Sequence, residues 1–132
     1  MGRMELVRVP TLTQDVPYAY ATVSPGGTVY AAGACPLDGD GQVVAPGDVA
    51  AQAAQVMANL VESLRAAGCG LHDVLKTTVY VASHDRNDLV AAWDVVRSAF
   101  GDHDAPSTLL GVSVLGYPDQ LLEVEAVAVR PG

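Results

Sequence analysis

Two stretches of the sequence space their apolar residues as an α-helix with one buried side does. In residues 49–67 these positions recur three and four apart, which places them along one face of a helix: Ala50, Ala53, Ala54, Met57, Leu60, Val61 and Leu64. Asp48 is a typical N-cap for this helix and Gly68 a typical stop. A helix with one apolar side must bury it against another layer, so this pattern requires a second layer.

Residues 86–100 form the second predicted helix. Asp85 is placed to cap its first turn and Gly101 to end it. The helical spacing again predicts one inward side: Leu89, Ala92, Trp93, Val96 and Phe100.

The remaining pattern is that of β-strands, rich in β-branched and aromatic residues and separated by turn residues. The predicted strands are residues 6–9, 18–23, 28–32, 74–81, 108–115 and 121–129. In the fourth strand, alternation puts Leu75, Thr77, Val79 and Val81 on one face and Lys76, Thr78 and Tyr80 on the other. The order β-β-β-α-β-α-β-β predicts one α+β domain over residues 1–132, with both helices on one face of a mixed sheet. The other face carries apolar residues, and self-association is the simplest way to cover them.

Composition excludes several classes of partner. The net charge is −8, from 15 acidic and 7 basic residues, so the surface repels nucleic-acid phosphates and anionic membranes. No apolar run approaches the roughly 18 residues of a membrane span, and no signal core follows the N-terminus. We therefore expect a cytoplasmic protein with Cys35 and Cys69 reduced. The three histidines lack the spacing of metal ligands, and we expect no metal.

Short motifs along nearly the whole chain resemble one known family. They are Pro17-Tyr18, residues 32–37 (AGACPL) followed by Gly41, residues 49–53 (VAAQA), Asn59-Leu60, residues 66–68 (AAG), residues 73–81 (DVLKTTVYV) and residues 123–128 (EVEAVA). Their order and spacing resemble the reactive-intermediate-deaminase (Rid, YjgF-like) family. The resemblance implies a ferredoxin-like (chorismate-mutase-like) subunit in a homotrimer, whose sheets enclose a barrel with three clefts between subunits. It also implies hydrolysis of reactive enamines and imines to 2-oxo acids and ammonia, without metal or cofactor.

The resemblance assigns roles to five residues. Tyr18 matches the tyrosine of the cleft, although an ordinary strand tyrosine fits as well. Glu123 matches the glutamate that orients or deprotonates the attacking water; a solvated carboxylate beside Glu125 is the alternative. Gly33 suits a close approach of backbone amides to the ligand, or else a strand bulge or tight packing. Cys35 lies near the expected mouth of the cleft. Together with Gly33 and Ser107, it is a candidate for binding the substrate.

Ser107 marks a departure from the family. In the family motif Pro-x-Arg-Ser/Thr the arginine holds the substrate carboxylate, and here we assign its place to Ser107. A hydroxyl offers one donor and no charge, so it does not replace a bidentate guanidinium. A cleft serine and a cleft cysteine of the family are also replaced, by Ala32 and Leu109. Arg97 and Arg130 are the candidate substitutes for the lost cation.

Three functions stay open from the sequence. The first is a Rid-like enzyme acting on a reactive imine or enamine metabolite that lacks a small carboxylate, with Glu123 and Tyr18 as catalytic residues. The second is a non-catalytic trimer that binds a small molecule or a protein. The third, endoribonuclease activity, is disfavoured by the acidic charge. A nucleophilic Cys35 would need a nearby base, for which His103 is a weak candidate.

Overall fold

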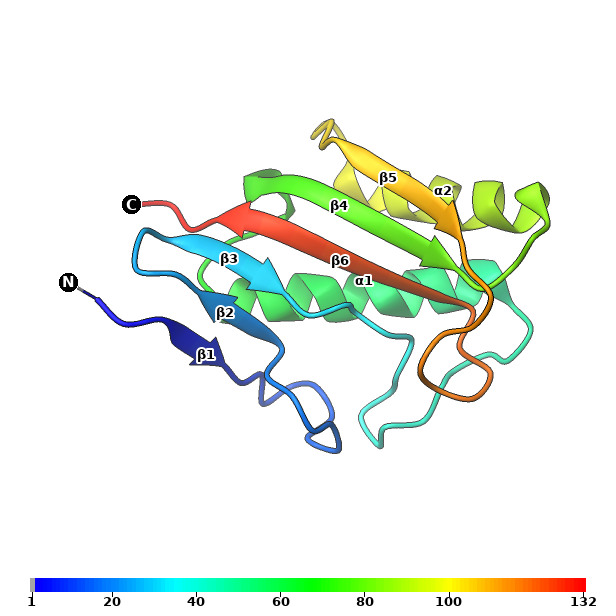
Figure 1. Cartoon of the computed structure of the whole chain (residues 1–132), viewed down its shortest axis with the longest axis horizontal. Helices are drawn as coiled ribbons and strands as arrows, with labels where there is room; N and C mark the ends of the chain where they lie inside the picture. The colour runs from blue at the N-terminus through cyan, green and yellow to red at the C-terminus, as the bar shows by residue number, and fades with distance from the viewer. Residues whose placement is uncertain (1) are drawn as a thin grey trace.

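Figure 1 shows the computed structural model, which describes residues 2–132 as one six-stranded sheet with two helices behind it. The elements are β1 (Glu5–Val7), β2 (Ala21–Val23), β3 (Thr28–Ala31), α1 (Val49–Ala66), the 3₁₀ turn η1 (Leu71–Asp73), β4 (Val74–Val81), α2 (Arg86–Phe100), β5 (Ser107–Gly111) and β6 (Leu122–Val129). The strand order is β1-β2-β3-β6-β4-β5, antiparallel except for the parallel pair β4–β5. The predicted α+β sandwich with a mixed sheet is confirmed.

The ends of both helices follow the predicted chemistry. The Asp48 carboxylate accepts from the Ala51 amide at 3.0 Å, and the Asp85 carboxylate accepts from the Asn87 amide at 2.9 Å. Gly68 follows α1 with a φ of +89°, which costs glycine no steric strain. These two caps fix where each helix enters the layer behind the sheet.

The predicted apolar face of α1 is partly wrong. Ala50 and Ala54 are exposed, whereas Gln52, Val56 and Ser63 join the buried face. Gln52 is buried because its side chain replaces a missing backbone partner: its Oε1 accepts from the Leu121 amide at 2.8 Å and its Nε2 donates to the Asp119 carbonyl at 3.0 Å. The hydrogen bonds of the Gln52 side chain to a distant loop thus turn a different face of α1 toward the core than the apolar spacing alone predicts.

The inward face of α2 is as predicted. Ala92 and Val96 are fully buried, and the larger Leu89, Trp93 and Phe100 are half-buried against the core. The core itself lies between the helices and β3, β4 and β6. Its largest fully buried apolar side chains are Leu60, Leu64, Leu122, Val9, Val23, Val29, Val56, Val74, Val79, Val81 and Val96.

The start of β4 departs from simple alternation. Leu75, predicted beside Val79 and Val81, is 51% exposed. The pairing with β6 skips from Val74 to Lys76, a register shift that adds one residue to β4. Leu75 is that extra residue, so its side chain leaves the core face.

The strand at residues 108–115 is also shorter than predicted, because β5 ends at Gly111. Its only partner, β4, ends at Val81, which pairs with Gly111. Residues 112–121 therefore have no strand to extend and form a loop instead. This loop returns the chain to β6 and, as described below, shapes the candidate site.

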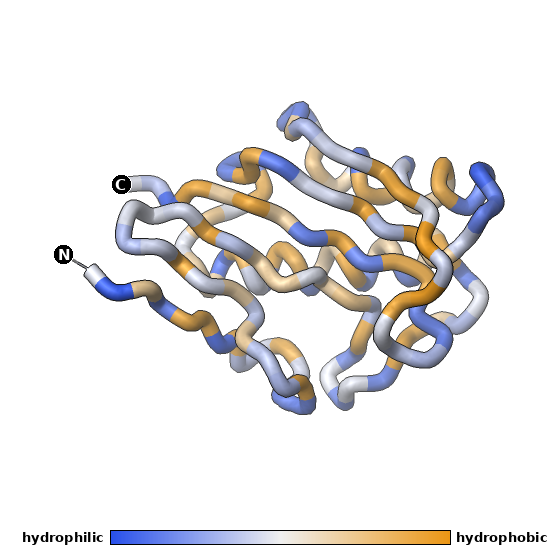
Figure 2. Tube along the Cα trace, in the orientation of Figure 1, coloured by the Kyte–Doolittle hydropathy of each residue, from blue (hydrophilic) through white to orange (hydrophobic). Residues whose placement is uncertain are grey.

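The sheet face away from the helices is open in the single chain, and we call it the open face. Along the first half of β6 the tube of Figure 2 alternates between apolar and hydrophilic residues, and along the second half it is apolar. Glu123, Glu125 and Val129 point to the open face, while Val124, Ala126 and Ala128 point to the core. Leu6, Tyr30, Leu110 and Val129 leave large apolar groups exposed on this side.

Gln52→Leu tests the buried polar tie between α1 and the loop. The substitution leaves the Leu121 amide and the Asp119 carbonyl without partners, so we expect a loss of about 2 kcal/mol or more in the free energy of unfolding. Urea denaturation monitored by circular dichroism measures it. Gln55→Leu, whose side chain bonds only Asn59 on the same helix, is the control and should change stability by less than about 1 kcal/mol. Equal effects of the two substitutions would show that the tie is unimportant.

Candidate functional site

The Glu123 carboxylate on β6 is held by two neighbours at one of its oxygens. The Gln120 amide Nε2 donates to Oε1 at 3.1 Å, and the Cys35 thiol lies 3.3 Å from the same oxygen. The thiol also lies 3.4 Å from the Gly33 carbonyl oxygen. Within residues 2–132 no donor bonds Oε2, so this oxygen can accept a hydrogen bond from water or a ligand.

Gly33 makes room for that carboxylate. A Cβ atom at position 33 would lie 2.1 Å from Glu123 Oε2 and 2.5 Å from its Cδ, closer than atoms can pack. The next residue, Ala34, pairs with Val124 through two backbone hydrogen bonds of 2.7 and 3.1 Å, which fixes the segment against β6. Tight packing against the Glu123 side chain therefore accounts for glycine at position 33, as one of the structural alternatives predicts.

Two tyrosines form the opposite wall. The hydroxyls of Tyr18 and Tyr117 lie 3.1 Å apart, although the residues are 99 positions apart in sequence. Burial raises the pKa of Tyr18 above its usual range, and the hydrogen bond to Tyr117 adds to the effect. At neutral pH Tyr18 is thus an uncharged phenol. One proton bridges the pair, and the other phenolic O–H can donate into the cleft.

Gln120 and Tyr117 are functional candidates that the sequence analysis missed. Gln120 is buried; its Oε1 accepts from the Tyr117 amide at 3.1 Å while its Nε2 donates to Glu123. One side chain thus links the loop after β5 to the carboxylate. Residues 116–119 were predicted only as a turn, and no local pattern distinguishes a turn that carries site residues from one that does not.

These residues surround a cleft with a volume of about 570 Å³. It is lined by Pro17, Tyr18, Ala32, Gly33, Cys35, Gly116, Tyr117 and Glu123. The structure therefore brings together four of the five predicted site residues: Tyr18, Gly33, Cys35 and Glu123. Asn59 on α1 supports the floor, since its amide donates to the Cys35 and Leu37 carbonyls at 2.9 Å each.

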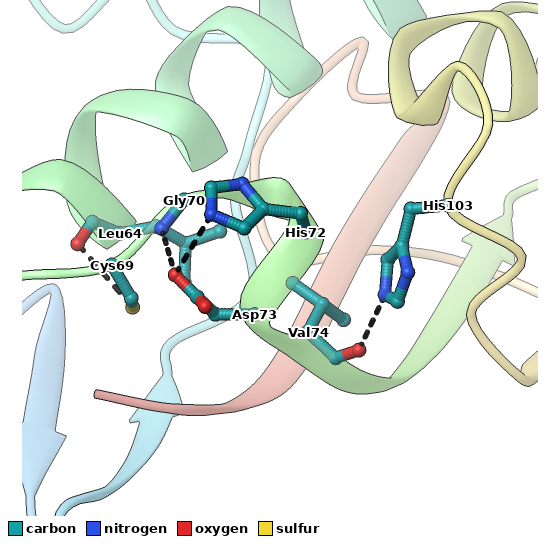
Figure 3. Close-up of polar contacts among 7 residues, drawn as sticks. All are labelled: Leu64, Cys69, Gly70, His72, Asp73, Val74 and His103. Atoms are coloured by element: carbon teal, nitrogen blue, oxygen red, sulfur yellow. Dashed lines mark hydrogen bonds and ion pairs between the residues drawn. The ribbon is translucent and has the colours of Figure 1, made fainter. Parts of the chain in front are cut away.

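Cys35 is a neutral thiol in this cleft. Burial, with the neighbouring Glu123 charge, raises its pKa to about 12. Almost none of it is the reactive thiolate at neutral pH, which argues against a nucleophile. The pairing of Cys35 with His103 is wrong: Figure 3 shows His103 Nε2 directed at the Val74 carbonyl oxygen, 2.8 Å away, at the start of β4.

Ser107, the fifth predicted residue, does not line this cleft. Its hydroxyl is hydrogen-bonded to that of Thr77, a fully buried residue on the helix side of β4, and lies 3.2 Å from the Ala105 carbonyl oxygen. The neighbouring Thr108 projects to the open face, where Lys76 Nζ donates to its hydroxyl at 2.9 Å. On β5 the position facing the open side is thus Thr108. Counted from Pro106, Thr108 and not Ser107 is also the third position of the motif Pro-x-Arg, and neither residue carries a charge.

The expected substitute cations also lie elsewhere. Arg130 forms an ion pair of 2.9 Å with Glu5, and Arg97 is exposed in the last turn of α2. Ala32 lines the cleft as expected, but Leu109 packs against the core. Glu123 is therefore the one residue of the cleft lining that is charged at neutral pH.

The surroundings of His72 and of Cys69 are structural. As Figure 3 shows, Asp73 caps the 3₁₀ turn by accepting from the Gly70 amide at 2.8 Å, with the exposed His72 ring 3.7 Å from the carboxylate. Cys69 lies 3.5 Å from the Leu64 carbonyl oxygen. Over residues 2–132 there is no group of three or more His, Cys, Asp and Glu side chains that could hold a metal ion. Within residues 2–132, neither α1 nor α2 is both long enough and apolar enough to cross a membrane.

The chain is similar to known proteins in both sequence and structure. Residues 11–130 match the family described as Endoribonuclease L-PSP. The mouse protein 2-iminobutanoate/2-iminopropanoate deaminase is 34% identical over 114 residues, which cover 86% of this chain and 82% of that protein. A RutC family protein of Pyrococcus horikoshii is 35% identical over 86% of this chain and 87% of its own length.

The chain belongs to the Rid (YjgF/L-PSP) family. Solved structures agree: the YjgF gene product of Escherichia coli superimposes with a TM-score of 0.78 at 32% identity, covering 96% of this chain and 98% of that one. Escherichia coli TdcF, solved with bound serine, gives a TM-score of 0.81 at 29% identity, covering 96% of this chain and 99% of that one. The predicted Rid subunit fold is confirmed by these matches.

Gly33→Ala tests the packing of glycine against the carboxylate. The added methyl overlaps Glu123 Oε2, so we expect the carboxylate to swing away from Gln120 and the unfolding midpoint to fall. A crystal structure and a thermal melt of the variant measure the two effects. Gly39→Ala, in a turn with no atom within 4 Å of the added Cβ, should leave both unchanged. An unmoved Glu123 in Gly33→Ala would contradict the packing described here.

Proposed function

We propose that this Rid protein hydrolyses a reactive imine or enamine metabolite in the cleft around Glu123. The proposal is supported above all by the seating of Glu123, with Oε1 held by Gln120 and Oε2 left open beside Gly33. That arrangement keeps one carboxylate oxygen available to accept a proton from water. The relatives named as 2-imino acid deaminases make imine hydrolysis the best-supported reaction class.

The reaction needs only a base and positioned donors. Glu123 Oε2 takes a proton from water as the water oxygen bonds to the carbon of a protonated imine. The proton then passes from Glu123 to nitrogen. The C–N bond breaks with its electron pair leaving on nitrogen while the hydroxyl oxygen forms the C=O bond. Glu123 carries the hydroxyl proton to the released amine, which leaves as an ammonium ion. The free phenolic O–H of the Tyr18–Tyr117 pair is positioned to hold the water or the substrate.

The substrate we propose carries no carboxylate on the imine carbon. Residues 105–111 contain no arginine, and Glu123 would repel a carboxylate placed beside it. Losing a charge-assisted pair costs on the order of 1.5–3 kcal/mol, so small 2-imino acids should be handled at least about tenfold less well. A non-catalytic binding protein is the second candidate, favoured by the same missing cation.

Glu123→Gln tests the proposed base. A general base contributes roughly 10²–10⁴-fold, so hydrolysis above the spontaneous rate should fall by about a hundredfold or more. The substrate is the preformed N-methyl imine of benzaldehyde, followed by stopped-flow absorbance. Glu125→Gln is the matched control on the same face of β6, because Glu125 bonds Tyr80 at 2.6 Å and lies outside the cleft. Binding of the imine without turnover in the wild type would favour the second candidate.

We also propose that the chain forms a homotrimer whose clefts lie between subunits. The apolar groups on the open face, including Leu110 at 43% exposure, are the surface that a second copy would cover. Light scattering should give three times the chain mass of 13.6 kDa. Leu110→Asp should lower that mass, whereas Val90→Asp, an exposed position on α2, should not. A monomer mass for the wild type would refute the trimer.

A further inference from the structure

A second cavity shares a wall with the cleft around Glu123. It has a volume of about 360 Å³ and is lined by Arg8, Gln14, Val16, Pro17, Tyr18 and Tyr20. Pro17 and Tyr18 line both cavities. Pro17 and Tyr18 therefore form the wall that the two cavities have in common.

Arg8 brings a positive charge to this second cavity. It follows β1, and its side chain is exposed between the buried Val7 and Val9, so it points away from the core. Arg65 and Arg130 pair with carboxylates at 3.5 and 2.9 Å, but within residues 2–132 no carboxylate lies within 4.0 Å of Arg8. In a chain of net charge −8, a guanidinium without an acidic partner can still take an external anion.

The wall beside Arg8 is fixed by internal hydrogen bonds. Gln14 Nε2 donates to the Val9 carbonyl at 2.9 Å and to the Leu12 carbonyl at 2.7 Å. The Tyr20 hydroxyl donates to the Thr13 carbonyl, and the Tyr20 ring packs edge-on against Tyr18 with centroids 6.3 Å apart. The second cavity thus has an ordered wall, as a binding subsite requires.

The two cavities carry opposite charges. Glu123 lines one and Arg8 the other, and Pro17 and Tyr18 line both. We infer that Arg8 anchors a carboxylate at the end of the substrate remote from the imine carbon. The substrate class is an imine whose carboxylate is separated from the C=N group by an apolar body lying across Tyr18. This inference rests on the function proposed above.

Binding of an inert probe tests the anchor without any turnover. In 4-(aminomethyl)benzoate the ammonium replaces the protonated imine nitrogen at Glu123, and the carboxylate lies across a flat ring. Calorimetry should show that the wild type binds it about tenfold or more tightly than benzylamine, which lacks the carboxylate. Arg8→Met should abolish that preference, while Arg97→Met, an exposed arginine on α2, should keep it. Equal affinity for the two probes in the wild type, or an unchanged preference in Arg8→Met, would overturn the inference.

Turnover separates the anchor from the proposed function. The wild type should hydrolyse the N-methyl imine of 4-formylbenzoate with a higher kcat/KM than the N-methyl imine of benzaldehyde. Arg8→Met should remove this difference by raising the KM for the 4-formylbenzoate imine, while the rate on the benzaldehyde imine stays the same. If the wild type hydrolyses neither imine, the proposed function fails, and the calorimetry alone decides whether Arg8 is an anion subsite. If Arg8→Met slows both imines equally, the anchor is refuted although the reaction stands.

Discussion

The contact between Glu123 and Gly33 is the constraint on which the rest of the site depends. Only a residue without Cβ lets the carboxylate lie against the strand connection at Gly33. With Oε2 seated there, Oε1 is left to Gln120 and Cys35, and Cys35 stays a neutral thiol because it is buried beside that charge. The site thus consists of one charged group, two neutral phenols and a thiol, and it suits proton transfer better than covalent catalysis.

The fold holds the Glu123 carboxylate in place through the hydrogen bonds of three side-chain amides. Gln52 on α1 bonds the loop that follows β5, and Gln120 in that loop bonds Glu123. Asn59 bonds the backbone carbonyls of Cys35 and Leu37. Gln52 and Asn59 bond groups far away in sequence, whereas Gln120 bonds Tyr117 and Glu123, which lie three residues away on either side. The sheet therefore determines where Glu123 lies, while these amides determine how it is oriented.

Sequence patterns predicted the elements well because caps and periodicity are local. Asp48, Asp85 and the one-sided helices gave the order and the layer arrangement, and the family motifs placed Tyr18, Gly33, Cys35 and Glu123 in one cleft. Patterns failed where a distant partner decides the outcome. Gln52 is buried because of Leu121, Leu75 leaves the core at a register shift with β6, and β5 stops where β4 does. The Ser107 side chain takes the helix side through its bond to Thr77, and Tyr117 and Gln120 carried no local signal at all.

A crystal structure of the wild type at a resolution that shows ordered water tests the central claim most directly. We predict a water molecule within about 2.6–3.2 Å of Glu123 Oε2, inside the cleft bounded by Tyr18 and Tyr117. Such a water is the expected nucleophile, held by the one carboxylate oxygen that the chain leaves open. An Oε2 bonded instead to a protein donor, from this chain or from a neighbouring copy, would contradict the account and remove Glu123 as the base.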